Sequence, residues 1–402
     1  MTPRPSVSDS SLWRNPGVVM LLVVQLLMSI RDMPLGSFFV VYLQSAGYAA
    51  TTITQVVSGA QIAGMLVAVV AGRLAQRQSS KRLWVIGIAV SALSALVFHA
   101  TVVWWVVLCW LIGGAGASLA SISGSSVLTM MGRQQRIGTL SSLFVICFTV
   151  GGVIGSPFAG WLIDQGSYTG YSAVLLGFSL AGMVLIWRFI PDTPVAEPPT
   201  VASSSGFDWA FFRRFAVLAI LGMRGLATIN YGMMLVMVPL LINRLTSDLY
   251  VVALYGSVML FVSSIAQFLT GRAADRWGAK WPTIVAFAVM IACGIVLAFG
   301  AESMTVLFVG GVISNAAAWA LLTLMYLWVA DWVTPTHHPL LFGWLHAVWN
   351  VCMVLGSLIG GALVDINNGL PFVVTGLLNI ASLALVTRLY RQAPSSHPVA
   401  TA

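Results

Sequence analysis

The stretch "GSPFAGWLID", residues 155–164, returns in altered form as "GSLIGGALVD" at residues 356–365. A second pair follows nearly the same spacing, because "GRLAQRQSSKR" at 72–82 is echoed by "GRAADRWGAK" at 271–280. The two offsets are 201 and 199 residues, and Gly113-Gly114 is likewise echoed by Gly310-Gly311. Self-similarity at one spacing indicates a duplicated structural unit. The sequence therefore predicts two related halves.

The composition places both halves in a lipid bilayer. Only 7% of the 402 residues are charged and 59% are hydrophobic, with a mean hydropathy of +0.94, whereas a soluble domain carries about 25% charged residues. A span needs about 20 apolar residues, and its backbone must satisfy its own hydrogen bonds, which favours helices. We expect an all-α polytopic membrane protein with two pseudo-symmetric six-helix bundles. The twelve predicted spans are 17–43, 52–72, 82–100, 102–130, 139–163, 171–190, 211–242, 250–272, 281–300, 304–330, 340–364 and 369–390.

The least hydrophobic interior segment divides the chain at its midpoint. It reads "PDTPVAEPPTVASSSG" over residues 191–206, and its Pro, Ser and acidic content is typical of a flexible linker. We therefore predict an amino-terminal bundle over 1–190, a cytoplasmic linker over 191–210 and a carboxy-terminal bundle over 211–402. Parallel repeats of this kind place a substrate site between the halves, near the membrane midplane.

The basic residues predict the topology. The net charge is +8, but 16 of the 19 Lys and Arg residues fall where an even number of spans precedes them. The positive-inside rule then places both termini in the cytoplasm and the chain in a cytoplasmic (inner) membrane. This distribution argues against nucleic-acid binding and for the lipid bilayer as partner. The first apolar stretch is too long for a signal-peptide core, so we expect no cleavage there.

The loop "GRAADRWGAK" resembles the cytoplasmic loop motif of the major facilitator superfamily, and the resemblance covers the whole chain. The matching positions are Gly271, Asp275, Arg276, Gly278 and Lys280. In the first half Gly72, Arg77 and Arg82 remain, but Gln76 replaces the acidic residue. The resemblance implies that these loops gate the transporter, and that the first-half copy depends on other contacts.

A second motif, "GGVIGSPFAG" at 151–160, is similar to the helix-five motif of the antiporter branches of that superfamily. Gly152, Gly155 and Gly160 would allow close helix packing, and Pro157 would kink the helix. The alternative is ordinary small-residue packing. Helix four has Cys109 where drug exporters of the family usually carry an arginine, which weakens assignment to drug:proton antiporters.

Charges inside the membrane mark the candidate mechanism. Asp32 is the one carboxylate near a predicted helix centre, and Arg31 and Arg224 are the two mid-membrane arginines. Such charges are costly in hydrocarbon and by default indicate an ion or substrate path. Because neighbours on a helix point about 100° apart, Arg31 and Asp32 should not simply neutralise each other. We predict that Asp32 couples protons and faces Arg224; the alternatives are a permanent salt bridge and contact with a charged substrate.

Polar and aromatic stripes would line the substrate cavity, since helices one, four, seven and ten do so in the superfamily. The first-helix stripe contains Gln25, Ser29, Asp32 and Gly36, and the seventh contains Arg224, Thr228 and Tyr231. Helix ten offers Asn315, Trp319, Thr323 and Tyr326; helix eleven His346, Trp349 and Asn350; and helix four Ser118, Ser121 and Ser125. Aromatic faces and hydroxyls suit a sugar or an amphipathic cation, whereas membrane serines are often only interhelical contacts. His346 could be a proton carrier or a packing residue.

These features predict a secondary active transporter for a small organic molecule. The first hypothesis is proton-coupled export of drug-like compounds or sugars. The alternative is a proton-coupled symporter importing a sugar or organic anion, in which Arg31 and Arg224 would bind a substrate carboxylate. We expect no enzyme activity, no cofactor beyond a proton gradient and no metal site, because no metal cluster, phosphate-binding loop or paired carboxylates appear. We also expect a monomer, since one chain suffices for the predicted cavity.

Overall fold

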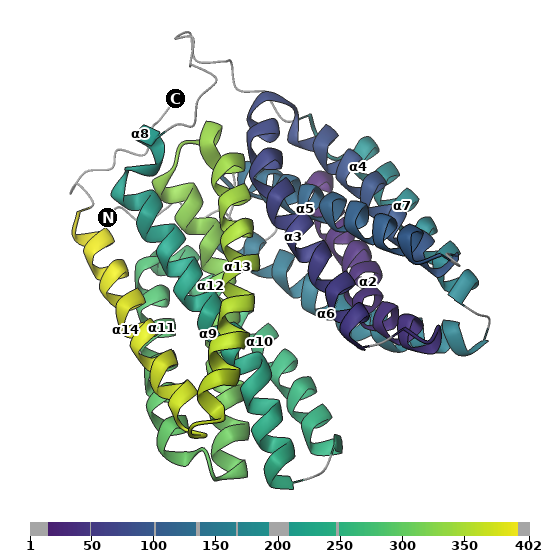
Figure 1. The fold of residues 1–402 in the computed structure, drawn as a ribbon. Coiled ribbons are helices and arrows are strands. Elements are labelled where there is room, and N and C mark those ends of the chain that lie inside the picture. The colour runs from purple at the N-terminus through teal and green to yellow at the C-terminus, as the bar shows by residue number, and fades with distance from the viewer. Residues whose placement is uncertain are drawn as a thin grey trace. The chain divides into compact units, whose positions relative to one another are not determined.

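The first of two compact units takes the described part of Met1–Ala202 together with Thr334–Asn350. The computed structural model describes residues 15–48, 50–99, 102–133, 137–165, 168–192, 209–246 and 249–392, and most of the predicted linker lies outside them. Figure 1 shows the described elements as helices. Those of the first unit are α2 (Pro16–Ser45), α3 (Ala50–Arg77), α4 (Ser80–Ser91), the 3₁₀ helix η1 (Ala92–His99), α5 (Val103–Arg133), α6 (Ile137–Gln165) and α7 (Tyr168–Phe189), with the short 3₁₀ helix η2 (Pro335–His337).

The second unit takes the described part of Ser203–Val333 together with Val351–Ala402. Its helices are α8 (Trp209–Phe212), α9 (Phe215–Thr246), α10 (Leu249–Trp277), α11 (Lys280–Gly300), α12 (Met304–Trp332) and α14 (Leu370–Arg391). Helix α13 (His338–Val364) contributes its residues up to Asn350 to the first unit and the rest to the second.

Eleven helices in the described part of the chain are long and apolar enough to cross a membrane. The remaining predicted span, 52–72, lies on α3, where the apolar stretch found is the shorter Ile62–Ala75. The prediction of an all-helical polytopic chain is confirmed. The third span departs from a regular α-helix, because α4 ends at Ser91 and continues as η1.

The duplication seen in the sequence is also present in the packing. Helix α5 packs on α3 and α4, and α12 packs on the equivalent α10 and α11. Helix α7 packs on α2 and α4, and α14 packs on the equivalent α9 and α11. Each unit therefore repeats one set of helix contacts.

The repeated glycines make equivalent close contacts in the two units. A Cβ atom added to Gly155 of α6 would lie 2.5 Å from the carbonyl oxygen of Ile30 on α2, and one added to Gly356 of α13 would lie 2.3 Å from that of Ile229 on α9. Both contacts join a motif glycine to the first helix of its own half. Only glycine lets the two backbones approach this closely, which is the physical reason the motif recurs.

The paired glycines of the fourth helix behave in the same way. A Cβ atom at Gly113 would meet Ser94 of η1, and one at Gly310 would meet Leu297 of α11. Gly114 approaches Ala60 on α3, and Gly311 approaches Tyr255 on α10. In both units, therefore, the first glycine of the pair faces the third helix and the second glycine faces the second helix.

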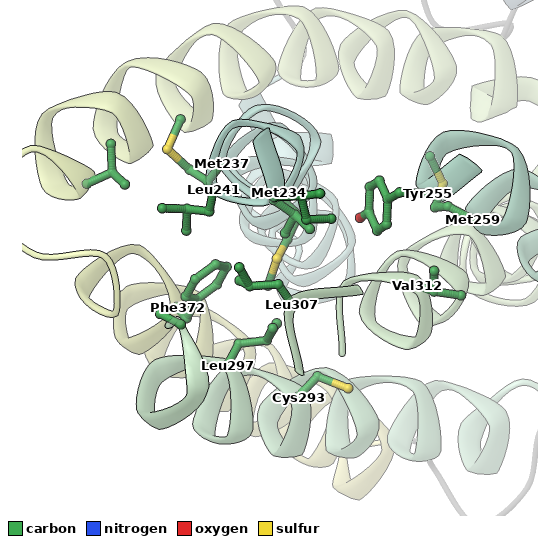
Figure 2. Packing of buried hydrophobic residues seen from close by; sticks show 14 residues of the cluster. Met234, Met237, Leu241, Tyr255, Met259, Cys293, Leu297, Leu307, Val312 and Phe372 are labelled. Carbon is green, nitrogen blue, oxygen red and sulfur yellow. The ribbon is translucent and has the colours of Figure 1, made fainter. Parts of the chain in front are cut away.

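Apolar side chains fill each unit separately. In the first unit Phe39 stacks on Trp110 with ring centroids 3.9 Å apart. In the second unit Met234, Met237, Leu297 and Phe372 belong to one buried cluster, and Figure 2 shows side chains from several helices converging on it. Hydrocarbon surroundings remove the usual hydrophobic drive between helices, so this close packing supplies cohesion.

Replacing Gly356 by Ala should destabilise the protein, because the new methyl group meets the Ile229 backbone, which must move. Overpacking of this kind costs about 1–3 kcal/mol. Gly256→Ala on α10 is the matched control, since a Cβ there meets nothing within 4 Å and alanine has the better helix propensity. Unfolding in detergent, followed by tryptophan fluorescence, should give a lower Tm for Gly356→Ala alone; equal Tm values for the two variants would contradict this packing.

Candidate functional site

The carboxylate of Asp32 pairs with the guanidinium of its neighbour Arg31 near the middle of α2. Arg31 Nε lies 2.8 Å from Asp32 Oδ1. The expectation that adjacent side chains would point too far apart to pair is wrong, because the flexible three-carbon stem of arginine curls back to its neighbour. The side chains differ in exposure, at 2% for Arg31 and 39% for Asp32. The acid is thus the accessible member of the pair.

Arg31 is held inside the first unit by two serines. Its Nη2 donates to Ser91 Oγ at 2.7 Å, and its Nη1 donates to Ser179 Oγ at 2.9 Å and lies 3.9 Å from Met28 Sδ. The serines come from α4 and α7, so three helices meet at one guanidinium. Arg31 is therefore buried within the first unit, and it does not have the accessible position that binding of a substrate carboxylate would require.

Ser91 also marks the change from α4 to η1. The carbonyl of Ser91 accepts from Ser94 Oγ at 2.6 Å, and that of Ala95 accepts from Ser172 Oγ of α7 at 2.7 Å. Long 3₁₀ segments are uncommon because their hydrogen-bond geometry is poorer. Here serine hydroxyls satisfy two of the carbonyls. Sequence reasoning missed Ser91 and Ser179, since single serines in apolar helices carry no signal of their partners.

The residues of the predicted polar stripe on α2 have different surroundings. Some pack against a neighbouring helix, and others have free space beside them. Ser29 is buried, and a Cβ at Gly151 of α6 would lie 2.4 Å from Ser29 Cβ. Its hydroxyl donates to the Gln25 carbonyl at 2.8 Å, and Gln25 Nε2 donates to Ser29 Oγ at 3.4 Å. Ser29 therefore lies in the α2–α6 packing, which corrects its expected cavity position, whereas a Cβ at Gly36 would meet nothing within 4 Å.

The helix-five motif supports this same region of α2. A Cβ at Gly152 would meet the Met33 side chain, and the nearest atom to one at Gly160 would be Phe38 Cζ at 3.5 Å. Pro157 lies inside α6, which continues through it as a helix. The motif thus packs α6 along α2 across the turns that carry Arg31 and Asp32. A kink at Pro157 stays a prediction.

A cluster of aromatic and polar side chains surrounds Arg224 in the second unit. Tyr326 of α12, Tyr231 of α9 and Cys352 of α13 all lie within electrostatic range of the Arg224 guanidinium. The rings of Tyr231 and Trp319 pack edge to face, with centroids 5.8 Å apart at 85°. Cys352 is therefore part of this site. We call these residues the Arg224 cluster.

The hydrogen bonds of the neighbouring polar residues are largely local. Thr228 Oγ1 donates to the Arg224 carbonyl at 2.7 Å, and Thr323 is buried. Asn315 Nδ2 donates to Tyr255 Oη at 3.0 Å and to the Gly311 carbonyl at 2.9 Å. The Tyr255 ring points from α10 toward Met234 (Figure 2). Asn315 is thus engaged with α10, and Tyr255 is a partner that the sequence did not indicate.

The two units carry equivalent polar contacts of different chemistry. At offsets of 199 and 200 residues, Asn230 of α9 corresponds to Arg31 and Asn379 of α14 corresponds to Ser179. Asn379 Nδ2 donates to Asn230 Oδ1 at 3.2 Å, just as Arg31 donates to Ser179. A buried polar contact therefore joins the first and last helices in both units. The position of Asp32 is occupied by Tyr231 in the second unit, so the carboxylate belongs to the first half alone.

Helix α13 brings one predicted residue, His346, to α5 within the first unit. His346 Nε2 lies 3.2 Å from Ser118 Oγ, and Asn350 Nδ2 donates to the His346 carbonyl at 2.9 Å. Ser125 is buried and Ser121 is exposed. His346 is therefore in contact with a predicted helix-four serine, and its role as a proton carrier stays a prediction.

The loop-motif residues occupy helix ends and one turn. Gly278 has φ +76°, the left-handed region that favours glycine, and it separates α10 from α11. Gly271 is buried in α10, Asp275 is half-buried, Arg276 is exposed and Lys280 begins α11. In the first unit Arg77 and Arg82 are exposed, whereas a Cβ at Gly72 would lie 2.8 Å from the Pro339 carbonyl oxygen. Gly72 thus serves close packing rather than a turn.

Duplicated helical units, apolar helices long enough to cross a membrane and an ion pair within one of them define a polytopic membrane protein. The chain matches the Major Facilitator Superfamily over residues 21–260 and 220–402, and it belongs to this family. Members of the family are transporters rather than enzymes, and they bind small-molecule substrates within a lipid bilayer.

Two curated relatives match part of the chain. Tetracycline resistance protein, class H, from Pasteurella multocida is 22% identical over 180 residues, which is 44% of either chain. MFS-type transporter TOXA from Cochliobolus carbonum is 30% identical over 115 residues, covering 28% of this chain and 21% of that protein. The chain thus spans less than half the length of either relative.

Solved structures share the fold over most of the chain. A bacterial homologue of the iron transporter ferroportin gives a TM-score of 0.79 at 11% identity, covering 93% of this chain and 99% of that one. The transporter FucP gives 0.76 at 13%, covering 92% and 98%. The human organic anion transporter MFSD10 gives 0.71 at 13%, covering 92% and 99%. At such identities the likeness is one of fold.

Asp32→Asn should lower the Tm, because it leaves the buried Arg31 charge without its counter-ion. The loss should be smaller than the about 3–5 kcal/mol of a fully buried pair, since Asp32 is partly exposed. The double variant Arg31→Met/Asp32→Asn removes both charges and should recover stability. Asp164→Asn, at the exposed end of α6, controls for loss of a carboxylate. A double variant no more stable than Asp32→Asn would contradict this account.

Proposed function

We propose that the chain is a secondary active transporter that exports a small organic molecule, a drug-like compound or a sugar, in exchange for protons. Alternating access, implied by the family, would expose the substrate to one side of the membrane at a time. Asp32 is the proton-coupling residue in this proposal. The protein would lie in a cytoplasmic (inner) membrane with both termini in the cytoplasm, as the distribution of Lys and Arg indicates.

The observation that carries the proposal is the unequal exposure of the Arg31–Asp32 pair. The guanidinium is buried and fixed by Ser91 and Ser179, whereas the carboxylate is 39% exposed. Asp32 uses Oδ1 for Arg31, which leaves Oδ2 for a proton or a substrate donor. Arginine stays protonated in proteins, so Asp32 is the member of the pair that can exchange protons.

Protonation of Asp32 would change the energy of the first unit. With Asp32 ionised, the pair is neutral; with Asp32 protonated, a buried positive charge remains with serine hydroxyls as its nearest partners. An uncompensated charge in a low-dielectric interior is costly. The two protonation states would therefore favour different conformations, and this difference is what coupling requires.

The Arg224 cluster supports a substrate with both a ring face and hydrogen-bonding groups. Tyr231 and Trp319 offer aromatic surfaces, and Arg224 and Tyr326 offer donors. Rings stack on aromatic faces, while cations are attracted to them. The name of the Pasteurella relative, a tetracycline resistance protein, supports the export direction.

The alternative is a proton-coupled symporter that imports a sugar or an organic anion. An anionic substrate would need accessible arginines, and the burial of Arg31 leaves only Arg224 for that role. This observation favours the export hypothesis with Asp32 facing the substrate path. The predicted encounter of Asp32 with Arg224 stays a prediction, because these residues belong to different units.

The test is substrate-driven proton movement in liposomes that contain a trapped pH dye. With wild-type protein and an imposed pH gradient, sugars and cationic dyes are screened for a change in internal pH. Asp32→Asn should reduce this change to the protein-free background, because an amide does not ionise and so cannot bind and release a proton as the carboxylate does. Substrate binding should survive in this variant. Asp164→Asn is the matched control and should behave as wild type.

The outcomes separate the hypotheses. The sign of the pH change distinguishes export from import. Normal proton movement by Asp32→Asn would show that the pair is a structural contact and would make His346 the next candidate.

Arg224→Gln should weaken binding of substrates that accept a hydrogen bond there. A hydrogen bond to a charged group contributes about 1.5–3 kcal/mol, so the half-saturating concentration should rise about tenfold or more. Competition between a carboxylate-bearing compound and a neutral sugar measures this effect. An equal loss for both would show that Arg224 donates to an acceptor that both compounds carry rather than pairing with a substrate charge, whereas an unchanged value would remove it from the site.

A further inference from the structure

One face of α10 carries an exposed apolar stripe. Phe261, Ile265 and Leu269 follow one another at helical spacing, and their exposed fractions are 69%, 46% and 59%. At 100° per residue these positions lie within a narrow arc. Arg272 and Arg276 continue the same arc and are also exposed. This face of α10 is therefore apolar along most of its length and basic at its C-terminal end.

The length of this stripe matches one leaflet of a bilayer. Phe261 and Arg272 are 11 positions apart, and at 1.5 Å per residue they are separated by about 16 Å along the helix axis. Half of a hydrocarbon core is about 15 Å. An acyl chain lying along the stripe would therefore bring its headgroup to the level of the two arginines.

Three cations at this end are held over aromatic rings. The Arg272 guanidinium lies 4.4 Å from the Phe268 centroid, Arg276 lies 5.6 Å from that of Trp277, and Lys280 Nζ lies 5.6 Å from that of Trp281. Both tryptophans are more than half exposed. Exposed tryptophans beside basic residues are typical of the membrane interface.

These cations lack acidic partners in the part of the chain that the structure describes. No ion pair there joins Arg272, Arg276 or Lys280 to an acid, Asp275 included. Lys81 in the first unit is the contrast: it lies over Trp187 but is also 3.8 Å from Asp192. The positive charge at the α10–α11 turn is thus available to an external anion.

We infer that the outer face of α10, from Phe261 to Arg276 together with Lys280, is a binding site for one anionic phospholipid. Its acyl chain lies along Phe261, Ile265 and Leu269, and its phosphate contacts the cations at the α10–α11 turn. The apolar stripe alone would suit any acyl chain, whereas the three cations select a negatively charged headgroup. Binding of this lipid does not require the proposed transport reaction, although Arg276 and Lys280 also belong to the loop motif.

The test compares lipids with the same oleoyl chains and different headgroups. Phosphatidylglycerol or phosphatidylcholine is added to the purified full chain in detergent, and the Tm is measured. Phosphatidylglycerol should raise the Tm of the wild type more than phosphatidylcholine does, and Arg272→Gln/Arg276→Gln should lose most of this difference. Arg213→Gln/Arg214→Gln is the matched control, because it removes two exposed arginines of the same unit outside the stripe; it should keep the difference.

Two further measurements keep the proposal falsifiable. Ile265→Ser/Leu269→Ser should also reduce the phosphatidylglycerol effect, because it disrupts the acyl contact without changing charge. Inorganic phosphate at the same concentration should leave the Tm unchanged. An equal loss in both arginine double variants would indicate general surface charge and overturn the site, and a full effect from inorganic phosphate would overturn the phospholipid as its ligand.

Discussion

The close approach of one glycine-bearing helix to the first helix of each half is the contact on which the structure depends. In a bilayer the backbone must satisfy its own hydrogen bonds, so cohesion comes from packing between helices. Gly155 against Ile30 and Gly356 against Ile229 provide it at equivalent places. A side chain at either glycine would force the backbones apart. The duplicated glycine motif therefore serves close packing between helices in both units.

This packing determines how the charged pair is presented. Ser29 and Ile30 face the glycines of α6. Arg31 therefore faces α4 and α7, where its guanidinium donates to Ser91 and Ser179. Asp32, one position further, then lies on the more exposed side of α2. A buried guanidinium with an accessible carboxylate is the electrostatic consequence. Asp32 is therefore a carboxylate whose charge affects the energy of the buried Arg31 guanidinium.

The two units share the geometry of this helix contact but differ in its chemistry. Arg31 with Ser179 and Asn230 with Asn379 occupy equivalent places, but a charged contact in one unit is an amide contact in the other. Tyr231 replaces the carboxylate and packs against Trp319. The first unit thus holds a carboxylate paired with a buried guanidinium, and the second holds an aromatic pair at the corresponding place.

The sequence by itself determined the membrane class, the helical spans, the duplication and the family, because hydropathy, repeat spacing and loop motifs are local properties of the chain. It also singled out Asp32, since a carboxylate in an apolar run is conspicuous. Only the tertiary structure decided that Arg31 pairs with Asp32, that Ser91 and Ser179 hold it, and that Ser29 lies in a helix contact. Those outcomes depend on which residues of other helices come within hydrogen-bonding distance, and helical periodicity carries no information about that.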